Sequence, residues 1–179
     1  MYSRQDCLKK YCSDYFVQKR LVEGSLYRID KNVYSEKSYV PELAIMAFKY
    51  PQAVVTMKTA FHLYNLTDVI MDVYDFATER DAAKISDRRI EQYFIPHELF
   101  PLGIQKFEYK GYNLSIYSKE RMLVELIRYS SKLPYDYYKE IILNYRKIIP
   151  SLNIQEIQEY AVVAPKSNMI LKILQKEVL

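Results

Sequence analysis

Few residues of this 179-residue chain could do chemistry, and they are scattered along it. His62 and His97 are the only two histidines. Each is isolated, and neither has metal-ligand spacing with the other or with a cysteine. His62 lies among apolar residues of an amphipathic segment, which favours a structural histidine over a general base. His97 follows a proline in an expected loop.

The cysteines and the nearby acids also have ordinary explanations. Cys7 and Cys12 are five residues apart, so a helix places them on different faces. This favours two small apolar thiols in a reducing compartment over a disulfide or a shared metal site. Asp68, Asp72 and Asp75 resemble a carboxylate cluster. In a strand, however, Asp72 and Asp75 point to opposite faces, so we interpret these acids as a solvated sheet edge.

Sequence motifs for catalysis are missing. The three glycines are too scattered for a phosphate-binding loop, and no nucleophile motif of the G-x-S-x-G type occurs. We therefore expect a protein that is not an enzyme and has no cofactor and no metal. No apolar run approaches the ~20 residues that span a bilayer, and the charged N-terminus is not that of a secretory signal. The default expectation is a cytoplasmic protein without a membrane partner.

The elements that could position a functional surface begin with two helices. A first helix is expected over residues 3–11, with Ser3 as its N-cap candidate. A second helix is expected over residues 14–23, after the cap residue Ser13. Gly24 should end this second helix, because glycine readily takes the left-handed conformation that follows many helices.

A hairpin and two more helices follow. The alternation of residues 26–35 predicts a β-hairpin in which Asn32 takes the left-handed turn conformation. One further helix should open at Pro41, and another should be capped by Thr56. The helix that opens at Pro41 should turn an apolar stripe inward, made of Leu43, Ala44, Ala47 and Phe48.

From residue 69 the pattern changes to strands and then to helices. Strands are expected within residues 69–78 and 88–96, followed by a hairpin that turns at Lys110 and Gly111 and a helix capped by Ser118. Further helices are expected over residues 135–149, 153–164 and 168–178. Strands followed by helices are typical of the α+β class. We predict an α+β fold, with an N-terminal winged helix-turn-helix domain over residues 1–68 and a mixed α/β C-terminal domain over residues 69–179.

The charge distribution permits nucleic-acid binding without requiring it. The net charge is +4, and residues 1–68 hold ten Lys and Arg against seven Asp and Glu. The second helix could reach base edges, and the hairpin and the end of the first helix could contact phosphates. The alternative is a solvated helix beside a solvated hairpin. The candidate DNA-binding residues are Lys9, Lys10, Tyr15, Gln18, Lys19, Arg20, Tyr27, Arg28 and Lys31.

Three stretches of the chain resemble the AbiEi family of antitoxins. The first is LVEGSLYRIDKNVY at 21–34, which looks like that family's winged-helix end. The second, which is the most specific, is KYPQAVVTMKTAFHLYNLTD at 49–68, similar to the family's central block. The third is IYSKERMLVELIR at 116–128, which looks like the hairpin-to-helix junction of its C-terminal domain.

The resemblance implies an antitoxin of a bacterial toxin–antitoxin system that acts in abortive infection, a form of phage defence. Its winged helix would bind an inverted repeat in the operator of its own operon and act as an autoregulating transcriptional repressor. Its C-terminal domain would counteract a nucleotidyltransferase-like toxin, directly or indirectly.

Two alternatives accompany this interpretation. The nineteen tyrosines also suit a protein-interaction module that neutralises a partner by direct contact without binding DNA. Six cations of the second domain are candidates for an antitoxin surface, although each could simply keep its face soluble. They are Lys84, Arg88, Arg89, Lys119, Arg121 and Arg128.

Overall fold

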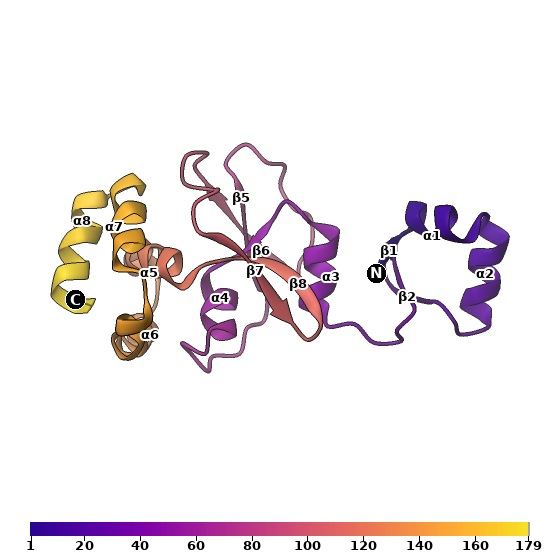
Figure 1. Cartoon of the computed structure of the whole chain (residues 1–179), viewed down its shortest axis with the longest axis horizontal. Helices are drawn as coiled ribbons and strands as arrows, with labels where there is room; N and C mark the ends of the chain where they lie inside the picture. The colour runs from indigo at the N-terminus through magenta and orange to yellow at the C-terminus, as the bar shows by residue number, and fades with distance from the viewer. Residues whose placement is uncertain (179) are drawn as a thin grey trace. The chain divides into compact units, whose positions relative to one another are not determined.

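The computed structural model describes residues 1–178, and the chain has an α+β fold that divides into two compact units (Figure 1). The first unit holds residues 1–51 together with the hairpin tip 108–113, and the second holds residues 52–107 and the chain from residue 114. The division predicted after residue 68 differs from this one. The short segment from residue 52 to residue 68 belongs to the second unit, because its strand pairs with that unit's sheet.

The first unit contains a small antiparallel sheet with strand order β1-β3-β2. The N-terminal strand β1 pairs with the second strand of the predicted hairpin, and Tyr2 lies opposite Tyr34. The elements of this unit are β1 (Tyr2–Ser3), α1 (Arg4–Tyr11), α2 (Asp14–Val22), β2 (Tyr27–Asp30), β3 (Val33–Ser35) and α3 (Glu42–Lys49).

Local capping signals set the bounds of α1 and α2. Ser3 and Asp6 form a reciprocal capping box at the start of α1. The Ser13 hydroxyl accepts a hydrogen bond from the Phe16 amide at the start of α2. Gly24 has a φ of +71° after α2, and Asn32 has a φ of +60° in the hairpin turn. These four predictions are confirmed, and each depends on residues close together in the sequence.

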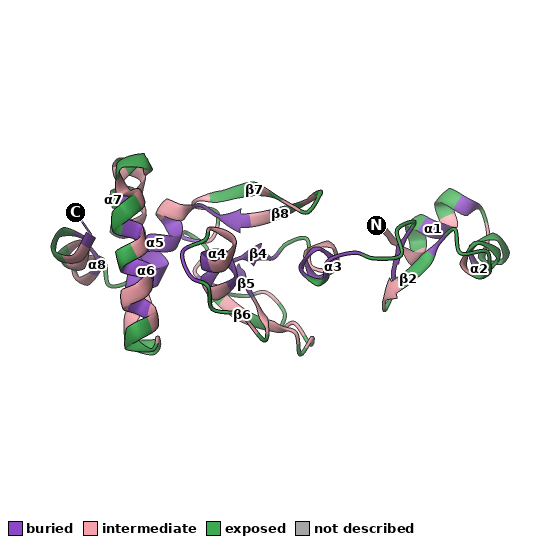
Figure 2. Cartoon of the chain, turned by 90° about the horizontal axis from the view of Figure 1, so that it is seen from below, coloured by how far each residue is buried: buried purple, intermediate pink, exposed green. Residues whose placement is uncertain are grey.

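A compact core holds α1, α2 and the hairpin together. Val17 of α2 is fully buried, whereas Tyr15, Gln18 and Lys19 lie on the exposed side of the same helix, as the periodicity predicts (Figure 2). The buried cluster consists of Cys7, Tyr11, Val17, Leu26 and Tyr34.

The apolar stripe predicted for α3 is only partly right. The structure buries a face around Leu43 and Met46, with Ala44 and Ile45 beside them. Ala47 and Phe48 are only half-buried. The buried face therefore lies nearer the start of the helix than the stripe predicts. Six consecutive apolar residues, 43–48, do not determine which side of such a short helix is buried.

The second unit is built on a five-stranded mixed sheet with strand order β6-β5-β4-β8-β7. The short strand β4 pairs antiparallel with β5 and parallel with β8, where Val55 lies opposite Ile116. Strands β5 and β6 pair in parallel. The strands are β4 (Val54–Val55), β5 (Tyr74–Glu79), β6 (Ile90–Ile95), β7 (Ile104–Tyr109) and β8 (Tyr112–Tyr117).

Helix α4 lies against this sheet, and the helices after β8 gather at one end of it (Figures 1 and 2). The strands and the later helices follow one another along the chain in the predicted order. The helical elements are α4 (Met57–Leu63), α5 (Lys119–Arg128), η1 (Ser130–Lys132), α6 (Tyr135–Ile148), η2 (Ile149–Ser151), α7 (Ile154–Val163), α8 (Ser167–Ile173) and η3 (Leu174–Val178).

Helix α5 is the centre of this unit. All seven residues from Arg121 to Ile127 are buried, so the helix is covered on every side, by α4, α7 and α8 among others. Ser118 caps it, with its hydroxyl accepting from the Arg121 amide at 3.2 Å. The Ser118 amide donates to the Gly103 carbonyl at 2.7 Å, which ties the loop before β7 to the start of α5.

Gly103 provides a test of this contact. Its φ is +75°, and a Cβ added there would lie 2.6 Å from Cβ of Arg121. We expect Gly103→Ala to lower the free energy of unfolding by about 2–4 kcal/mol, from backbone strain and overpacking together. Urea denaturation measures this.

Gly111→Ala is the matched control for Gly103→Ala. Its φ is +82°, but an added Cβ would meet no atom of the described residues within 4 Å. It should therefore cost only about 1–2 kcal/mol, the price of the left-handed conformation alone. Equal losses in the two variants would contradict the tight contact at Gly103.

Candidate nucleic-acid interface

Helix α2 presents an exposed face of mixed aromatic and polar side chains. Tyr15 and Phe16 are 69% and 49% exposed, and their rings meet edge to face with centroids 5.4 Å apart. Gln18 and Lys19 lie one turn further along and are also exposed. Large apolar rings exposed beside hydrogen-bonding groups are typical of a contact surface.

The hairpin is tied to the end of this helix by the backbone. The amides of Ser25 and Leu26 donate to the carbonyl of Arg20 at 3.0 and 3.2 Å. These bonds satisfy a carbonyl at the helix end and fix where the hairpin leaves α2. Arg28 and Lys31 of the hairpin are exposed. The candidate cations of helix and hairpin therefore belong to one continuous structural element.

Some of these cations are already engaged within the unit. Lys10 donates to the Glu36 carboxylate at 2.7 Å and to the Tyr2 hydroxyl, and these bonds raise the pKa of its ammonium group. The guanidinium of Arg20 lies 4.6 Å from the centroid of the Tyr11 ring. The side chains of Lys10 and Arg20 are therefore held by contacts within the first unit.

All nine residues predicted to contact DNA are exposed in the first unit. Lys19 also forms an ion pair with Glu23, at 3.8 Å and largely in water, which contributes little to stability. The nine are Lys9, Lys10, Tyr15, Gln18, Lys19, Arg20, Tyr27, Arg28 and Lys31.

The six candidate cations of the second unit do not form one surface. Lys84 and Arg88 are exposed, whereas Arg89 makes a bidentate pair with Asp87 at 2.9 and 2.8 Å. Lys119 is half-buried, with its ammonium group 5.5 Å from the centroid of the Tyr64 ring.

The prediction that Arg121 belongs to an exposed surface is wrong. Its side chain is fully buried and forms an ion pair with Glu125, one turn along α5. Arg128 is largely buried and donates to the same carboxylate at 2.7 Å. The two arginines do share a helix face, as their spacing predicts, but that face is turned towards the core. Glu125 forms an ion pair with both arginines, which makes their burial possible.

The interpretation of Asp75 as part of a solvated edge is also wrong. Asp75 is fully buried, because β5 lies between β4 and β6 and α4 covers this side of it. Its carboxylate accepts the Lys58 amide at 2.8 Å, and its own amide donates to the Thr59 hydroxyl at 2.8 Å. Asp72 and Asp68, in contrast, are exposed.

Asp75 thus caps α4 from β5, a strand that comes later in the sequence. The predicted cap residue, Thr56, holds the N-cap position, but its side chain makes no capping hydrogen bond. Its hydroxyl contacts the Met122 sulfur at 3.6 Å instead. Burial raises the pKa of the Asp75 carboxyl to about 7, with a further contribution from Glu91, while the bond from the Lys58 amide opposes this rise.

The raised pKa of Asp75 predicts how stability depends on pH. The folded chain holds a proton at this carboxyl over a range where the unfolded chain has lost it, so stability falls as pH rises from about 4 through 7. Asp75→Asn removes this loss. We expect the variant to gain roughly 2–4 kcal/mol relative to the parent chain between pH 5 and pH 8.

Urea denaturation at the two pH values measures this difference. Asp72→Asn is the matched control, because Asp72 is an exposed acid three residues away, and its variant should follow the pH dependence of the parent chain. A stability difference between Asp75→Asn and the parent that is the same at pH 5 and pH 8 would contradict the buried ionisation.

The histidines and cysteines form no further site in the described chain. His97 lies between two acids, with Nε2 2.8 Å from Asp81 and Nδ1 3.3 Å from Glu79, and these contacts raise its pKa. Cys7 is buried and Cys12 is exposed, so the two thiols face different ways as expected. Among residues 1–178, no three His, Cys, Asp or Glu side chains gather as a metal site would require.

Comparison of the sequence with known proteins identifies no related family or protein. No protein-family model matches the sequence, and no curated protein matches it either. Within residues 1–178, no helix combines the length and the apolar composition needed to cross a bilayer.

Proposed function

We propose that this protein is a DNA-binding antitoxin of the AbiEi type, which represses its own operon and counteracts a nucleotidyltransferase-like toxin. The observation that carries the DNA-binding part is the joined surface of α2 and the β2–β3 hairpin. In a winged helix-turn-helix, the second helix enters the major groove and the hairpin, or wing, contacts the adjacent backbone.

The side chains on this surface suit those two roles. Gln18 could pair with an adenine edge, and Lys19 with a guanine edge or a phosphate. Arg28 and Lys31 extend from the wing, where cations contact phosphates without reading the sequence. The exposed rings of Tyr15 and Phe16, at the start of α2, offer apolar contact to bases such as thymine.

A paired substitution tests this surface. Lys19→Ala with Arg28→Ala should weaken binding to the DNA upstream of the gene by ~10-fold to 100-fold. The slope of log affinity against log salt concentration should also fall in magnitude by about 1–2. The variant neutralises fewer phosphates, so its binding releases fewer counterions. Fluorescence anisotropy with a labelled operator fragment, between about 0.05 and 0.2 M KCl, measures both quantities.

The charge-matched control is Lys172→Ala with Lys176→Ala, two exposed lysines of the C-terminal helices in the other unit. It changes the net charge by the same amount and should leave operator affinity within about twofold, since neither lysine belongs to the proposed DNA-binding surface. If both double variants bind equally well, α2 and the hairpin are not the DNA-binding surface.

A second candidate function has its own observation. The helices of the second unit expose large apolar side chains at Tyr135, Leu143 and Val162, each more than half exposed. Such residues suit direct contact with a partner protein. Under this alternative, the product of the neighbouring gene co-purifies with the chain. Leu143→Arg should abolish this co-purification. The parent chain should show no binding to the operator at 0.2 M KCl.

A further inference from the structure

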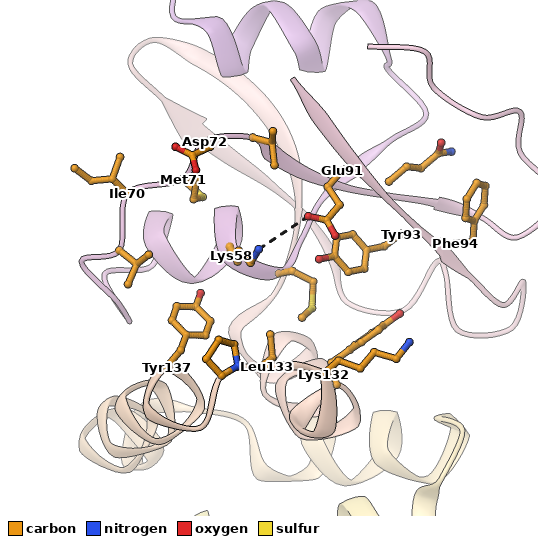
Figure 3. A pocket seen from close by; sticks show the side chains of 16 residues that line it. Lys58, Ile70, Met71, Asp72, Glu91, Tyr93, Phe94, Lys132, Leu133 and Tyr137 are labelled. Atoms are coloured by element: carbon orange, nitrogen blue, oxygen red, sulfur yellow. Dashed lines mark ion pairs between the residues drawn. The ribbon is translucent and has the colours of Figure 1, made fainter. Parts of the chain in front are cut away.

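The second unit contains a pocket of about 730 Å³ that the proposed DNA-binding surface does not use (Figure 3). Four stretches of chain build it: the start of α4, residues 69–73, residues 91–94 of β6, and residues 129–137 around η1 and the start of α6. Its volume lies in the range typical of sites for small organic ligands.

Flat aromatic surfaces make up much of the wall. Tyr93 and Tyr129 line the pocket and meet edge to face, with ring centroids 5.7 Å apart and an interplanar angle of 87°. Tyr137 approaches from α6, and Met57 adds a polarisable side chain. Walls of this kind favour a planar aromatic body, because ring contacts add to the area that such a ligand buries.

Two buried oxygens of the second unit lack hydrogen-bond partners among the described residues. The Tyr137 hydroxyl, which belongs to a pocket-lining residue, has none among residues 1–178. Oδ1 of Asp75 has none either; Asp75 is fully buried and does not line the pocket, and its other carboxylate oxygen accepts the Lys58 amide. An unpaired buried polar group costs roughly 1–3 kcal/mol, so a ligand that supplies its partner is favoured.

The charged groups of the pocket are balanced. Lys58 and Lys132 line it from α4 and η1, whereas Asp72 lines it from the segment before β5 and Glu91 from β6. Lys58 and Glu91 are only 4.0 Å apart and both partly exposed, so a ligand can compete for either. Carboxylates accept hydrogen bonds from amino groups, and ammonium groups bind phosphates. The pocket therefore offers a ligand both carboxylate acceptors and ammonium groups.

We propose that this pocket binds a nucleotide, with the base against Tyr93 and Tyr137 and the phosphates at Lys58 and Lys132. The base supplies the flat body and the hydrogen-bonding edge that the walls lack, and the phosphates supply the charge that the lysines attract. The same chemistry could come from a free nucleotide or from the end of a single strand, and the test below separates these two sources.

Isothermal titration calorimetry of the full chain tests the proposal, with ATP, GTP, CTP and UTP as probes in EDTA and about 0.15 M KCl. At least one of the four should bind with a Kd below ~1 mM. Its nucleoside alone and inorganic tripolyphosphate alone should each bind at least ~10-fold more weakly, because each lacks half of the contacts. A 5′-phosphorylated tetranucleotide that binds more tightly than any free nucleotide would identify a strand end as the ligand.

Two matched pairs of variants assign the contacts. Tyr137→Phe removes only the unpaired hydroxyl and should weaken nucleotide binding ~3-fold to 10-fold. Tyr135→Phe, at an exposed position of the same helix that does not line the pocket, should leave it unchanged. Lys132→Ala should weaken the nucleotide by ~5-fold or more and its nucleoside hardly at all, whereas Lys172→Ala should affect neither.

Three results would overturn the proposal: no binding by any of the four nucleotides or the tetranucleotide, equal binding of tripolyphosphate and nucleotide, or unchanged binding in Tyr137→Phe. Operator binding by the same variants separates this proposal from the previous one. Tyr137→Phe should keep the operator affinity of the parent chain, since it lies in the other unit from α2. Either function can then fail while the other stands.

Discussion

Two opposite charges, on Arg121 and Glu125, lie inside the second unit with almost no contact with water. Removing Glu125 alone would leave the buried Arg121 charge unpaired, which typically costs 3–5 kcal/mol. Arg128, one turn further along α5, donates to the second oxygen of the same carboxylate. All three charged groups belong to α5, so these ion pairs are made within the helix and allow it to be buried.

Other parts of the second unit contact this charge cluster. The guanidinium of Arg121 lies 5.1 Å from the centroid of the Tyr117 ring, and the Tyr117 hydroxyl donates to the carbonyl of Phe100. The guanidinium of Arg128 lies 4.4 Å from the centroid of the Tyr129 ring, and Tyr129 lines the pocket. The charge cluster therefore connects the loop before β7, the end of β8 and the pocket through direct contacts.

Signals between neighbours in the sequence predict much of the fold. Ser3 and Ser13 cap their helices, and Gly24 and Asn32 take left-handed conformations, because each of these effects depends on a few adjacent residues. The alternation of apolar residues likewise predicts the order of the strands and the later helices.

Sequence reasoning fails where a partner comes from elsewhere in the chain. Charge alone predicts that Arg121 and Asp75 are exposed, yet both are buried. The spacing of Arg121 and Glu125 is a local signal that could have suggested the ion pair, but not its burial. No local signal could have found Asp75 as a cap of α4, because β5 and α4 are brought together only by the sheet. The pocket could not be predicted from local signals either, because four separate stretches of the chain form it.

The cap that Asp75 supplies to α4 has an evolutionary consequence. An acid on the neighbouring strand frees position 56 from the requirement to cap the helix, and the Thr56 hydroxyl turns to Met122 instead. In homologous chains, positions 56 and 75 should therefore vary together. Where the acid at 75 is replaced by an apolar residue, natural selection should favour Asp, Ser or Asn at 56, because the first amides of the helix still need an acceptor.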